Sequence, residues 1–419
     1  MADVADSITA HSDPTFINPG KREAYQPSLT SMQRLLPRAV LLLATLALIL
    51  QVIHLFTGAG ATPLADADSA GTLDMPFVSS LPGPFLLLAA AWASLRLMYR
   101  SALLPAASIS FLVSSVVAFV LLYTLTLRDT GSWAFWLEVA AAWLLAWLCV
   151  EQLASVKSMS RVLGTALAIV IPVIFGVWIL VLWELLTRGF NVPQVLLPAP
   201  SAIGARFVSS TSILWADFQQ TFLKAVLIGY AIGCGAGFIV AVLIDRSPFL
   251  QRGLLPIGNL VSALPIVGVA PIMVMWFGFD WPSKAAVVIV MTFFPMLVNT
   301  VAGLSAAQPM QHDLMKTYAA SYWQSLFKLR IPEALPFIFN ALKINSTLAM
   351  IGAIVAEFFG TPTVGMGFRI STEVGRMNVD MVWAEIAVAA VAGSLFYGVV
   401  VLAERWLTFW HPSIRSSKR

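Results

Sequence analysis

The stretch KTYAASYWQSLFKLRIPEALP, residues 316–336, is a short amphipathic segment between two long apolar ones. It carries three cations, a mixed aromatic face and two prolines four residues apart. Ser321 followed by Gln324 fits a capping box, in which each side chain bonds a backbone N–H near the start of a helix. The pattern predicts a helix from about Tyr322 to about Arg330.

The residues on both sides of this helix predict an elbow between two membrane segments. Pro332 is expected to end the short helix, and Pro336 to open the next spanning one. Ala319 and Ala320 are small, which permits a tight corner and the close approach of another backbone. Periodicity alone leaves a second interpretation open, in which the helix lies on lipid headgroups.

The composition of the whole chain indicates that lipid is its solvent. Of 419 residues, 59% are hydrophobic and 11% are charged, whereas soluble domains have about 25% charged residues. The mean hydropathy is +0.84 and the formal net charge is +4. The cations form no basic stripe with interleaved aromatics, which argues against nucleic-acid binding. We expect an all-α polytopic membrane protein.

About ten segments approach the roughly 20 apolar residues that a spanning helix needs. They are 39–57, 84–99, 103–127, 133–150, 163–186, 219–244, 254–277, 284–305, 339–359 and 382–407. Lys and Arg gather in alternate loops, which predicts that both termini and the elbow are cytoplasmic. Residues 1–37 are polar and predict a disordered cytoplasmic tail without a cleavable signal peptide.

Residue types that carry enzyme chemistry are sparse. The four histidines are scattered, and neither a metal-ligating spacing nor a phosphate-binding glycine loop occurs in the sequence. We therefore expect no catalytic residue, no metal and no ATPase site in this chain. Cys149 and Cys234 lie in apolar runs and are interpreted as packing residues. Gly229, Gly233 and Gly237 recur every fourth residue, which favours close helix packing in lipid.

A few polar residues fall within the predicted spans and are candidates for a solute pathway. Asn299, Asn345, Ser346 and Glu357 could contact many small polar molecules. Glu357 would be a carboxylate at membrane depth. Such a group is costly in lipid, which points to a functional role. The alternative for Glu357 is the water interface, because Gly360 and Pro362 end its helix just beyond.

The opening stretch resembles the cytoplasmic EAA loop of binding-protein-dependent permeases in ATP-binding cassette importers. In that loop, EAA is followed by three residues, Gly, nine residues and I-x-L-P. Here 313–315 take the EAA place, Ala319 the glycine place, and Leu329, Ile331 and Pro332 the closing residues. The acidic residue is conservatively changed and the two alanines are not kept. LLPAPSAI (196–203), SALPIVGVAPIMVMWFG (262–278), FFPMLVNTVAGL (293–304) and AEFFGTPTVGMGFRI (356–370) follow the order of the nitrate/sulfonate/taurine branch, which includes presumed pyrimidine and vitamin-precursor transporters.

The resemblance implies the following organisation. A six-helix permease core, 161–412, contains the coupling loop 306–338 and is preceded by an accessory four-helix region, 38–160, with a cytoplasmic tail at 413–419. The residues implied in docking to the ATPase are Asp313, Ala319, Ala320, Ser321, Trp323, Leu329, Ile331 and Pro332. The core would lie in a bacterial inner membrane and form a pore with a second permease subunit, as a homodimer.

The resemblance also implies the partners of the core. Two cytoplasmic ATPases would use the ATP, and an extracytoplasmic binding protein would deliver the solute. Within the branch, the 358–378 tract favours a small heteroaromatic or vitamin precursor over nitrate. Two other classes of protein remain open. A secondary transporter driven by an ion gradient would predict two halves of inverted topology. A membrane scaffold would leave the elbow unexplained.

The orientation can be tested with reporter fusions. Fusions after Arg161 and after Arg252 should both report a cytoplasmic position, and a fusion near Asp68 an external one, because the cations mark alternate loops. Reporter activity in cells is the measurement. An external signal after Arg252 would contradict the ten-helix arrangement.

Overall fold

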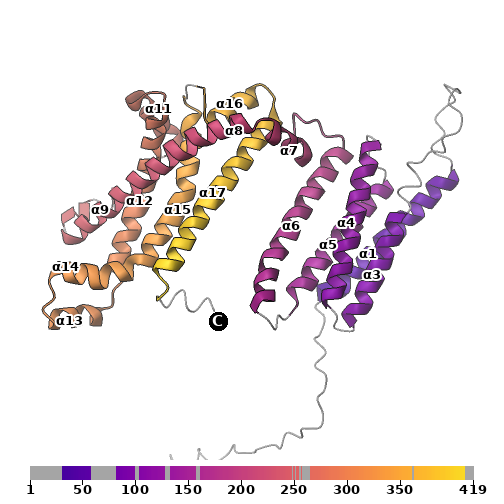
Figure 1. Ribbon diagram of the computed structural model, residues 1–419, viewed down its shortest axis with the longest axis horizontal. Coiled ribbons are helices and arrows are strands. Elements are labelled where there is room, and N and C mark those ends of the chain that lie inside the picture. Colours follow the sequence, from indigo (N-terminus) through magenta and orange to yellow (C-terminus); the bar gives the residue numbers. More distant parts are fainter. Residues whose placement is uncertain are drawn as a thin grey trace, which may run out of the picture. The chain divides into compact units, whose positions relative to one another are not determined.

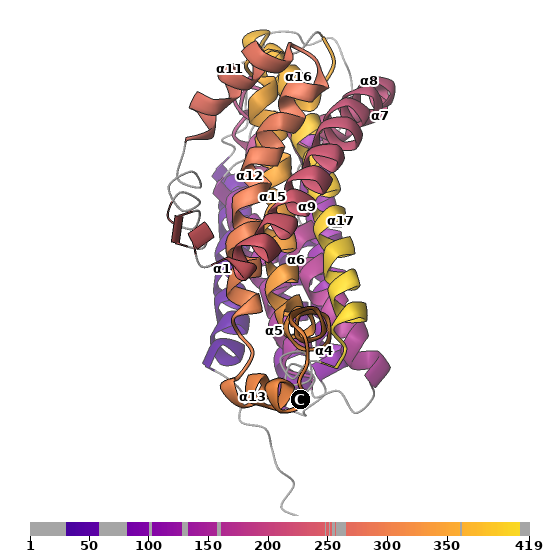
Figure 2. The ribbon, with the colours of Figure 1, turned by 90° about the vertical axis from the view of Figure 1, so that its left-hand side faces the viewer.

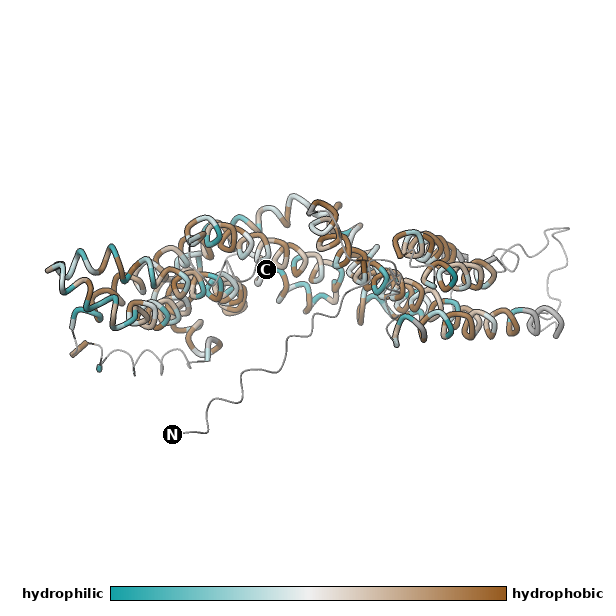
Figure 3. Tube along the Cα trace, turned by 90° about the horizontal axis from the view of Figure 1, so that it is seen from below, coloured by the Kyte–Doolittle hydropathy of each residue, from teal (hydrophilic) through white to brown (hydrophobic). Residues whose placement is uncertain are grey.

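The structure is a computed structural model, and it is helical throughout its described part. It describes residues 31–57, 82–99, 103–127, 133–156, 161–247, 249–250, 252–253, 256, 265–360 and 363–410. No strand occurs in these ranges. Apolar residues follow most of the helical trace in Figure 3. A helical chain suits lipid, because a helix satisfies its backbone N–H and C=O groups internally.

Eight of the described helices are long and apolar enough to cross a membrane. Two shorter apolar helices, Gly83–Tyr99 and Val267–Phe277, fall where two further spans were predicted. The all-α polytopic class is thereby confirmed.

The described residues up to Asn191 form one compact unit. Its helices are α1 (Ser31–Thr57), α3 (Pro82–Tyr99), α4 (Leu103–Leu127), α5 (Trp133–Ala154) and α6 (Arg161–Gly189). Helix α5 packs against α1, α4 and α6 around a core of leucine, alanine and valine side chains. Figure 1 shows these helices in indigo to magenta. Their buried polar side chains pair with one another: Gln51 donates to Glu138, and Ser94 bonds Ser110 at 2.7 Å.

The described residues from Val192 onward form the second unit. At its centre α12 (Trp281–Leu304) packs against both α9 (Leu227–Arg246) and α15 (Ile331–Glu357), and α17 (Val379–Leu407) packs on α15. The remaining elements are α7 (Pro200–Ser209), α8 (Thr211–Phe218), η1 (Gln219–Val226), α11 (Ile266–Phe277), α13 (Pro309–Thr317), α14 (Tyr322–Ser325), η2 (Leu326–Arg330) and α16 (Met366–Gly375). The segments η1 and η2 are π-helical. Figures 1 and 2 both place α13 at one end of this unit and α8, α11 and α16 at the other.

The predicted glycine stripe is where α9 meets α12. A Cβ at Gly233 would lie 2.1 Å from Thr292 Oγ1, and one at Gly237 would lie 2.5 Å from the Phe293 carbonyl oxygen. Gly235, on the other side of the same helix, faces open space. The expected packing role is confirmed for the stripe, since no larger side chain fits between these two backbones.

Two features differ from the sequence-based expectation. Helix α1 already begins at Ser31, so 31–37 are helical rather than part of a disordered tail, because Leu36 is buried in the core. The boundary between compact units falls after Asn191, so α6 groups with the first unit; its assignment to the permease core stays a prediction. The predicted tails at 1–30 and 413–419 lie outside the described residues.

The glycine packing predicts unequal effects of one methyl group at two nearby positions. Gly233→Ala should destabilise the protein by about 1–3 kcal/mol, because the added carbon overpacks the α9–α12 contact. Gly235→Ala should be neutral or stabilising by up to about 1 kcal/mol, since alanine favours helix and meets no neighbour. Thermal unfolding of the purified protein in detergent is the measurement, and equal midpoints for the two variants would contradict the packing.

Candidate functional site

The elbow starts with a tight turn after α13. The N–H of Ala320 bonds the carbonyl of Met315 at 3.0 Å, and that of Ala319 bonds the carbonyl of Lys316 at 2.9 Å. Ala319 has a φ of 50°, so the turn is a Schellman motif with a left-handed residue at its corner. This conformation costs a residue with a side chain roughly 1–2 kcal/mol. The corner is the position where the EAA loop has glycine.

The capping box predicted at Ser321 is confirmed. Ser321 Oγ accepts from the N–H of Gln324 at 3.3 Å, and the Ser321 N–H donates to Gln324 Oε1 at 2.8 Å. The chain therefore leaves the turn at Ala319 and enters a new helix within three residues. Both helix ends at the corner are satisfied by local groups.

The predicted end of this helix is wrong. Helices α14, η2 and α15 form one uninterrupted span, Tyr322–Glu357, with Pro332 and Pro336 inside it. The π turn explains how Pro332 is accommodated: the N–H of Ile331 bonds the carbonyl of Leu326, five residues back. This wider turn falls where the proline supplies no N–H. The elbow is thus continuous with α15 in a single span of 36 residues.

Arg330 ties the base of the elbow to two other helices. Its guanidinium donates to Asp245 of α9 through both terminal nitrogens, at 2.6 and 2.5 Å, and through Nε to the carbonyl of Leu304 of α12 at 3.0 Å. The hydroxyl of Tyr322 also donates to Asp245, at 3.0 Å. Bidentate Arg–carboxylate pairs fix geometry as well as charge. We call the contacts of Arg330, Asp245 and Tyr322 the elbow clasp.

The α13 part of the elbow exposes apolar side chains. Met310, Leu314 and Tyr318 recur every fourth residue and are 80%, 56% and 78% exposed; we call them the apolar ridge. None of the α13 residues is buried. On the neighbouring turn, Trp323 and Phe327 stack with ring centroids 6.1 Å apart and are also exposed. Clustered exposed apolar groups on a rigid support are typical of an interaction surface.

All eight residues predicted to couple to an ATPase lie on this elbow. Asp313 is exposed and pairs with Lys316 at 3.2 Å. Leu329, Ile331 and Pro332 are half-buried at the base of the elbow. Their part in docking stays a prediction.

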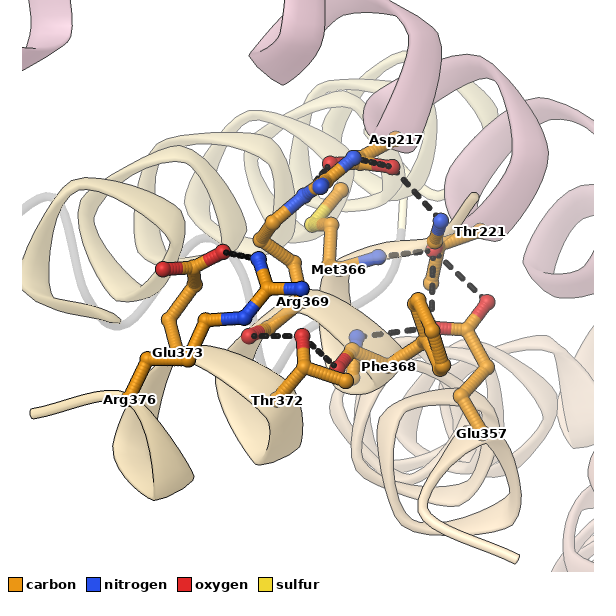
Figure 4. A network of polar contacts seen from close by, with 11 residues as sticks. Asp217, Thr221, Glu357, Met366, Phe368, Arg369, Thr372, Glu373 and Arg376 are labelled. Atoms are coloured by element: carbon orange, nitrogen blue, oxygen red, sulfur yellow. Dashed lines mark hydrogen bonds and ion pairs between the residues drawn. The ribbon is translucent and has the colours of Figure 1, made fainter. Parts of the chain in front are cut away.

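A second polar cluster lies at the opposite end of the unit, where α16 begins. Three consecutive N–H groups there have buried side-chain acceptors: Gly365 bonds Asp217 Oδ1 at 2.6 Å, Met366 bonds Thr221 Oγ1 at 2.8 Å, and Gly367 bonds Glu357 Oε2 at 2.7 Å. Figure 4 shows this arrangement. The first N–H groups of a helix have no partner within it and attract negative charge.

Arg369 adds an ion pair to this cluster. Its Nε lies 2.8 Å from Asp217 Oδ2, and Asp217 is fully buried. The hydrogen bond to that carboxylate raises the pKa of Arg369 above its ordinary value, so the guanidinium stays charged. At the other end of α16, Glu373 pairs with Arg376 at 3.2 Å and accepts from Asn378 at 2.7 Å.

Two more charged residues border the cluster. Lys284 is buried, donates to the carbonyl of Phe279 at 2.5 Å and attracts Glu357 electrostatically. Asp280 caps α12: its bond from the Trp281 N–H, at 2.8 Å, is the main reason that the pKa of Asp280 lies below its usual value. Within the described ranges, no group of three His, Cys, Asp or Glu could hold a metal ion.

The four predicted pathway residues are dispersed. Asn345 is buried and donates to the carbonyl of Thr292 at 2.7 Å. Ser346 is also buried and bonds within its own helix. Asn299 is half-buried and accepts from exposed Asn340 at 3.4 Å. Glu357 belongs to the α16 cluster, so no single site unites the four, and their part in transport stays a prediction.

Sequence reasoning missed four residues that hold these clusters together: Asp217, Thr221, Asp245 and Arg369. The partners lie far apart in the chain, 152 residues for Asp217 and Arg369 and 85 for Asp245 and Arg330. The available sequence signal was a single acidic residue at the border of an apolar run. This signal identified Glu357, and it applies equally to Asp217 and Asp245.

The left-handed corner predicts a stabilising substitution. Ala319→Gly should raise the stability of the protein by about 1 kcal/mol, since glycine adopts positive φ without a steric cost. The matched control is Ala320→Gly, which should be neutral or destabilising, because Ala320 does not have a positive φ. Thermal midpoints of the two variants are compared, and a lower midpoint for Ala319→Gly would contradict the assigned turn.

Comparison with known proteins supplies the family. Residues 233–415 match the model of the binding-protein-dependent transport system inner membrane component. A probable ABC transporter permease protein of Haemophilus influenzae is 30% identical over 230 residues, 55% of this chain and 93% of that protein. The formylaminopyrimidine transport permease protein of Halalkalibacterium halodurans is 30% identical over 57% of this chain and 95% of its own.

A third relative names a different solute. The riboflavin transport system permease protein of Chloroflexus aurantiacus is 29% identical over 62% of this chain and 95% of its own. These matches leave more than a third of the chain uncovered, which is consistent with additional helices beside a permease core. The match across nearly the full length of a relative at 30% identity shows that the chain belongs to the binding-protein-dependent permeases of ATP-binding cassette importers.

Proposed function

We propose that this chain is the membrane-spanning subunit of an ATP-driven importer and that its elbow, residues 306–338, docks on a cytoplasmic ATPase. The observation that carries the proposal is the elbow itself. It presents the apolar ridge to solvent on a corner that the Schellman motif and the capping box define. A surface of this kind suits a partner that pushes on it, because a force on the ridge reaches the helices through the elbow clasp.

The elbow clasp gives the docking surface a mechanical connection. Asp245 belongs to α9, Leu304 ends α12, and Arg330 is continuous with α15. These three helices also form the packed centre of the unit. A movement of the elbow is therefore shared among all three instead of bending one of them.

Membership of the family and the distribution of charges support the remaining parts of the proposal. We propose that the elbow and both termini lie in the cytoplasm of a bacterial cell, which the Lys and Arg residues of alternate loops support. A second permease subunit, which we propose is a copy of this chain, would complete the pore. An extracytoplasmic binding protein would deliver the solute, and ATP would be hydrolysed on a separate subunit.

For the solute, we propose a small polar molecule of the heteroaromatic or vitamin-precursor class. Relatives named for formylaminopyrimidine and riboflavin transport support this choice. Relatives named for aliphatic sulfonate and taurine transport are of similar identity, 28% and 26%. Titration of the partner binding protein with members of each class decides between them.

The apolar ridge provides a test of the ATPase contact. Leu314→Asp should abolish co-purification of the ATPase and solute uptake, because a charge at the centre of a docked apolar surface would be buried without a partner. Leu314 is exposed, so the protein itself should still insert and fold.

Lys328→Ala is the matched control, since Lys328 is exposed on the same elbow but outside the ridge. Lys328→Ala should leave solute uptake and ATPase co-purification nearly unchanged, because ordinary surface substitutions have small effects. Uptake in cells and ATPase co-purification are measured together. Normal uptake by Leu314→Asp would mean that the elbow rests on the membrane surface and contacts no partner.

A further inference from the structure

The helix that carries the elbow reaches the opposite end of the unit without a break. The span Tyr322–Glu357 has 36 residues, which at about 1.5 Å per residue is roughly 54 Å of helix. Figure 1 shows α14 and α13 at one end of α15 and α16 at the other, and Figure 2 shows α13 and α16 at the same opposite ends. Glu357 is the last residue of this helix. Any element that Glu357 holds is therefore attached to the end of this helix that lies opposite the elbow.

Glu357 is buried and holds two elements. Its carboxylate accepts from Thr221 Oγ1 of η1, at 2.8 and 3.0 Å, and from the N–H of Gly367 in α16, at 2.7 Å. The Thr221 hydroxyl in turn accepts from the N–H of Met366 at 2.8 Å. One carboxylate thus connects the end of α15 to the first turn of α16 and, through one hydroxyl, to η1.

The fit around this carboxylate is tight. A Cβ at Gly365 would lie 2.7 Å from Glu357 Oε1, and that residue has a φ of 144°, a conformation that other residues rarely adopt. A Cβ at Gly367 would lie 2.2 Å from the carbonyl of Ile354. Two glycines therefore allow the α16 backbone to contact the end of α15 directly. The contact leaves no space for a larger side chain at either position.

A second attachment holds α16 from the other side. Asp217 of α8 accepts from the N–H of Gly365 and pairs with Arg369 one turn into α16. Helix α16 is therefore clamped between α15 and the α8–η1 segment by two buried carboxylates, as Figure 4 shows. A relative movement of α15 and α8 must change how α16 is held.

We propose that Glu357 is a positioning residue for transport: it fixes α16 to the end of α15, so that a displacement produced at the elbow is transmitted to α16 at the opposite end of the subunit. This inference rests on the proposed function, because it takes the force from an ATPase at the elbow. Helix α16 then acts as the moving element of the gate on the side where solute enters.

The acceptor chemistry explains why a carboxylate is required. The Gly367 N–H points at one carboxylate oxygen, while Thr221 lies within bonding distance of both. A glutamine would present one oxygen and one NH₂ group, so one of the two attachments must weaken. The positive end of the α16 dipole would also lose one of its two negative partners, and only Asp217 would remain.

The test uses a reporter cysteine on α16 in the assembled transporter. Val374→Cys places a thiol at an exposed position, and both native cysteines, Cys149 and Cys234, are buried. The complete complex is reconstituted in liposomes and labelled with a membrane-impermeant maleimide, with and without vanadate-trapped nucleotide. Labelling rate, ATP hydrolysis, ATPase co-purification and uptake are measured on the same preparations.

In the otherwise unchanged protein, we expect trapped nucleotide to change the labelling rate. Glu357→Gln should remove that dependence and lower uptake on the order of tenfold, as expected for a weakened charge-assisted hydrogen bond, while hydrolysis and co-purification persist. Arg376→Gln is the matched control: its ion pair with Glu373 lies on α16, and the contacts of Glu357 are untouched. It should leave the nucleotide dependence intact.

Thr221 provides a second pair of variants in case Glu357→Gln does not fold. Thr221→Val removes the hydroxyl at nearly constant volume and should uncouple labelling from nucleotide, whereas Thr221→Ser keeps the hydroxyl and should restore coupling. Nucleotide-dependent labelling that persists in Glu357→Gln or Thr221→Val would overturn the inference, as would its absence from the otherwise unchanged transporter. Failure of the ATPase to co-purify with the unchanged chain would instead overturn the proposed function.

Discussion

Helix ends are the constraint on which this structure depends, because in lipid each unpaired backbone group needs a partner from the protein. At the elbow the partners are local: a left-handed Ala319 closes α13, and Ser321 with Gln324 opens the next helix. At α16 the partners are distant, since three buried side chains from other elements accept its first N–H groups. Local caps create a self-contained surface, and distant caps create a connection between helices.

This difference decides how much of the molecule is predictable from sequence. The capping box, the glycine stripe and the apolar spans all depend on residues a few positions apart, and the structure confirms them. The two buried clusters depend on residues as much as 152 positions apart, and no local pattern pairs Asp217 with Arg369. Glu357 was singled out by its cost in lipid, but the cost does not reveal that its partner is the first turn of another helix.

The error at Pro332 has the same origin. Proline ends a helix when its missing N–H and its ring disrupt a regular i→i+4 turn. Here the turn before it is π-helical, and the bond from Ile331 to Leu326 spans five residues. Residue types predict the conflict between proline and helix but not the π turn that resolves it, and Leu326 and Ile331, which form the bond of that turn, pack in a core with side chains of α9 and α12.

A continuous helix with a carboxylate contact at each end has a mechanical consequence. At its base Arg330 donates hydrogen bonds to Asp245, and at its end Glu357 accepts one from the backbone of α16. If Pro332 had ended the helix, a hinge would separate these contacts and movement at the elbow would be lost in bending. Because the π turn keeps the helix unbroken, the elbow and α16 can be displaced together, and the membrane crossing connects the proposed docking surface to the helix that we propose responds to it.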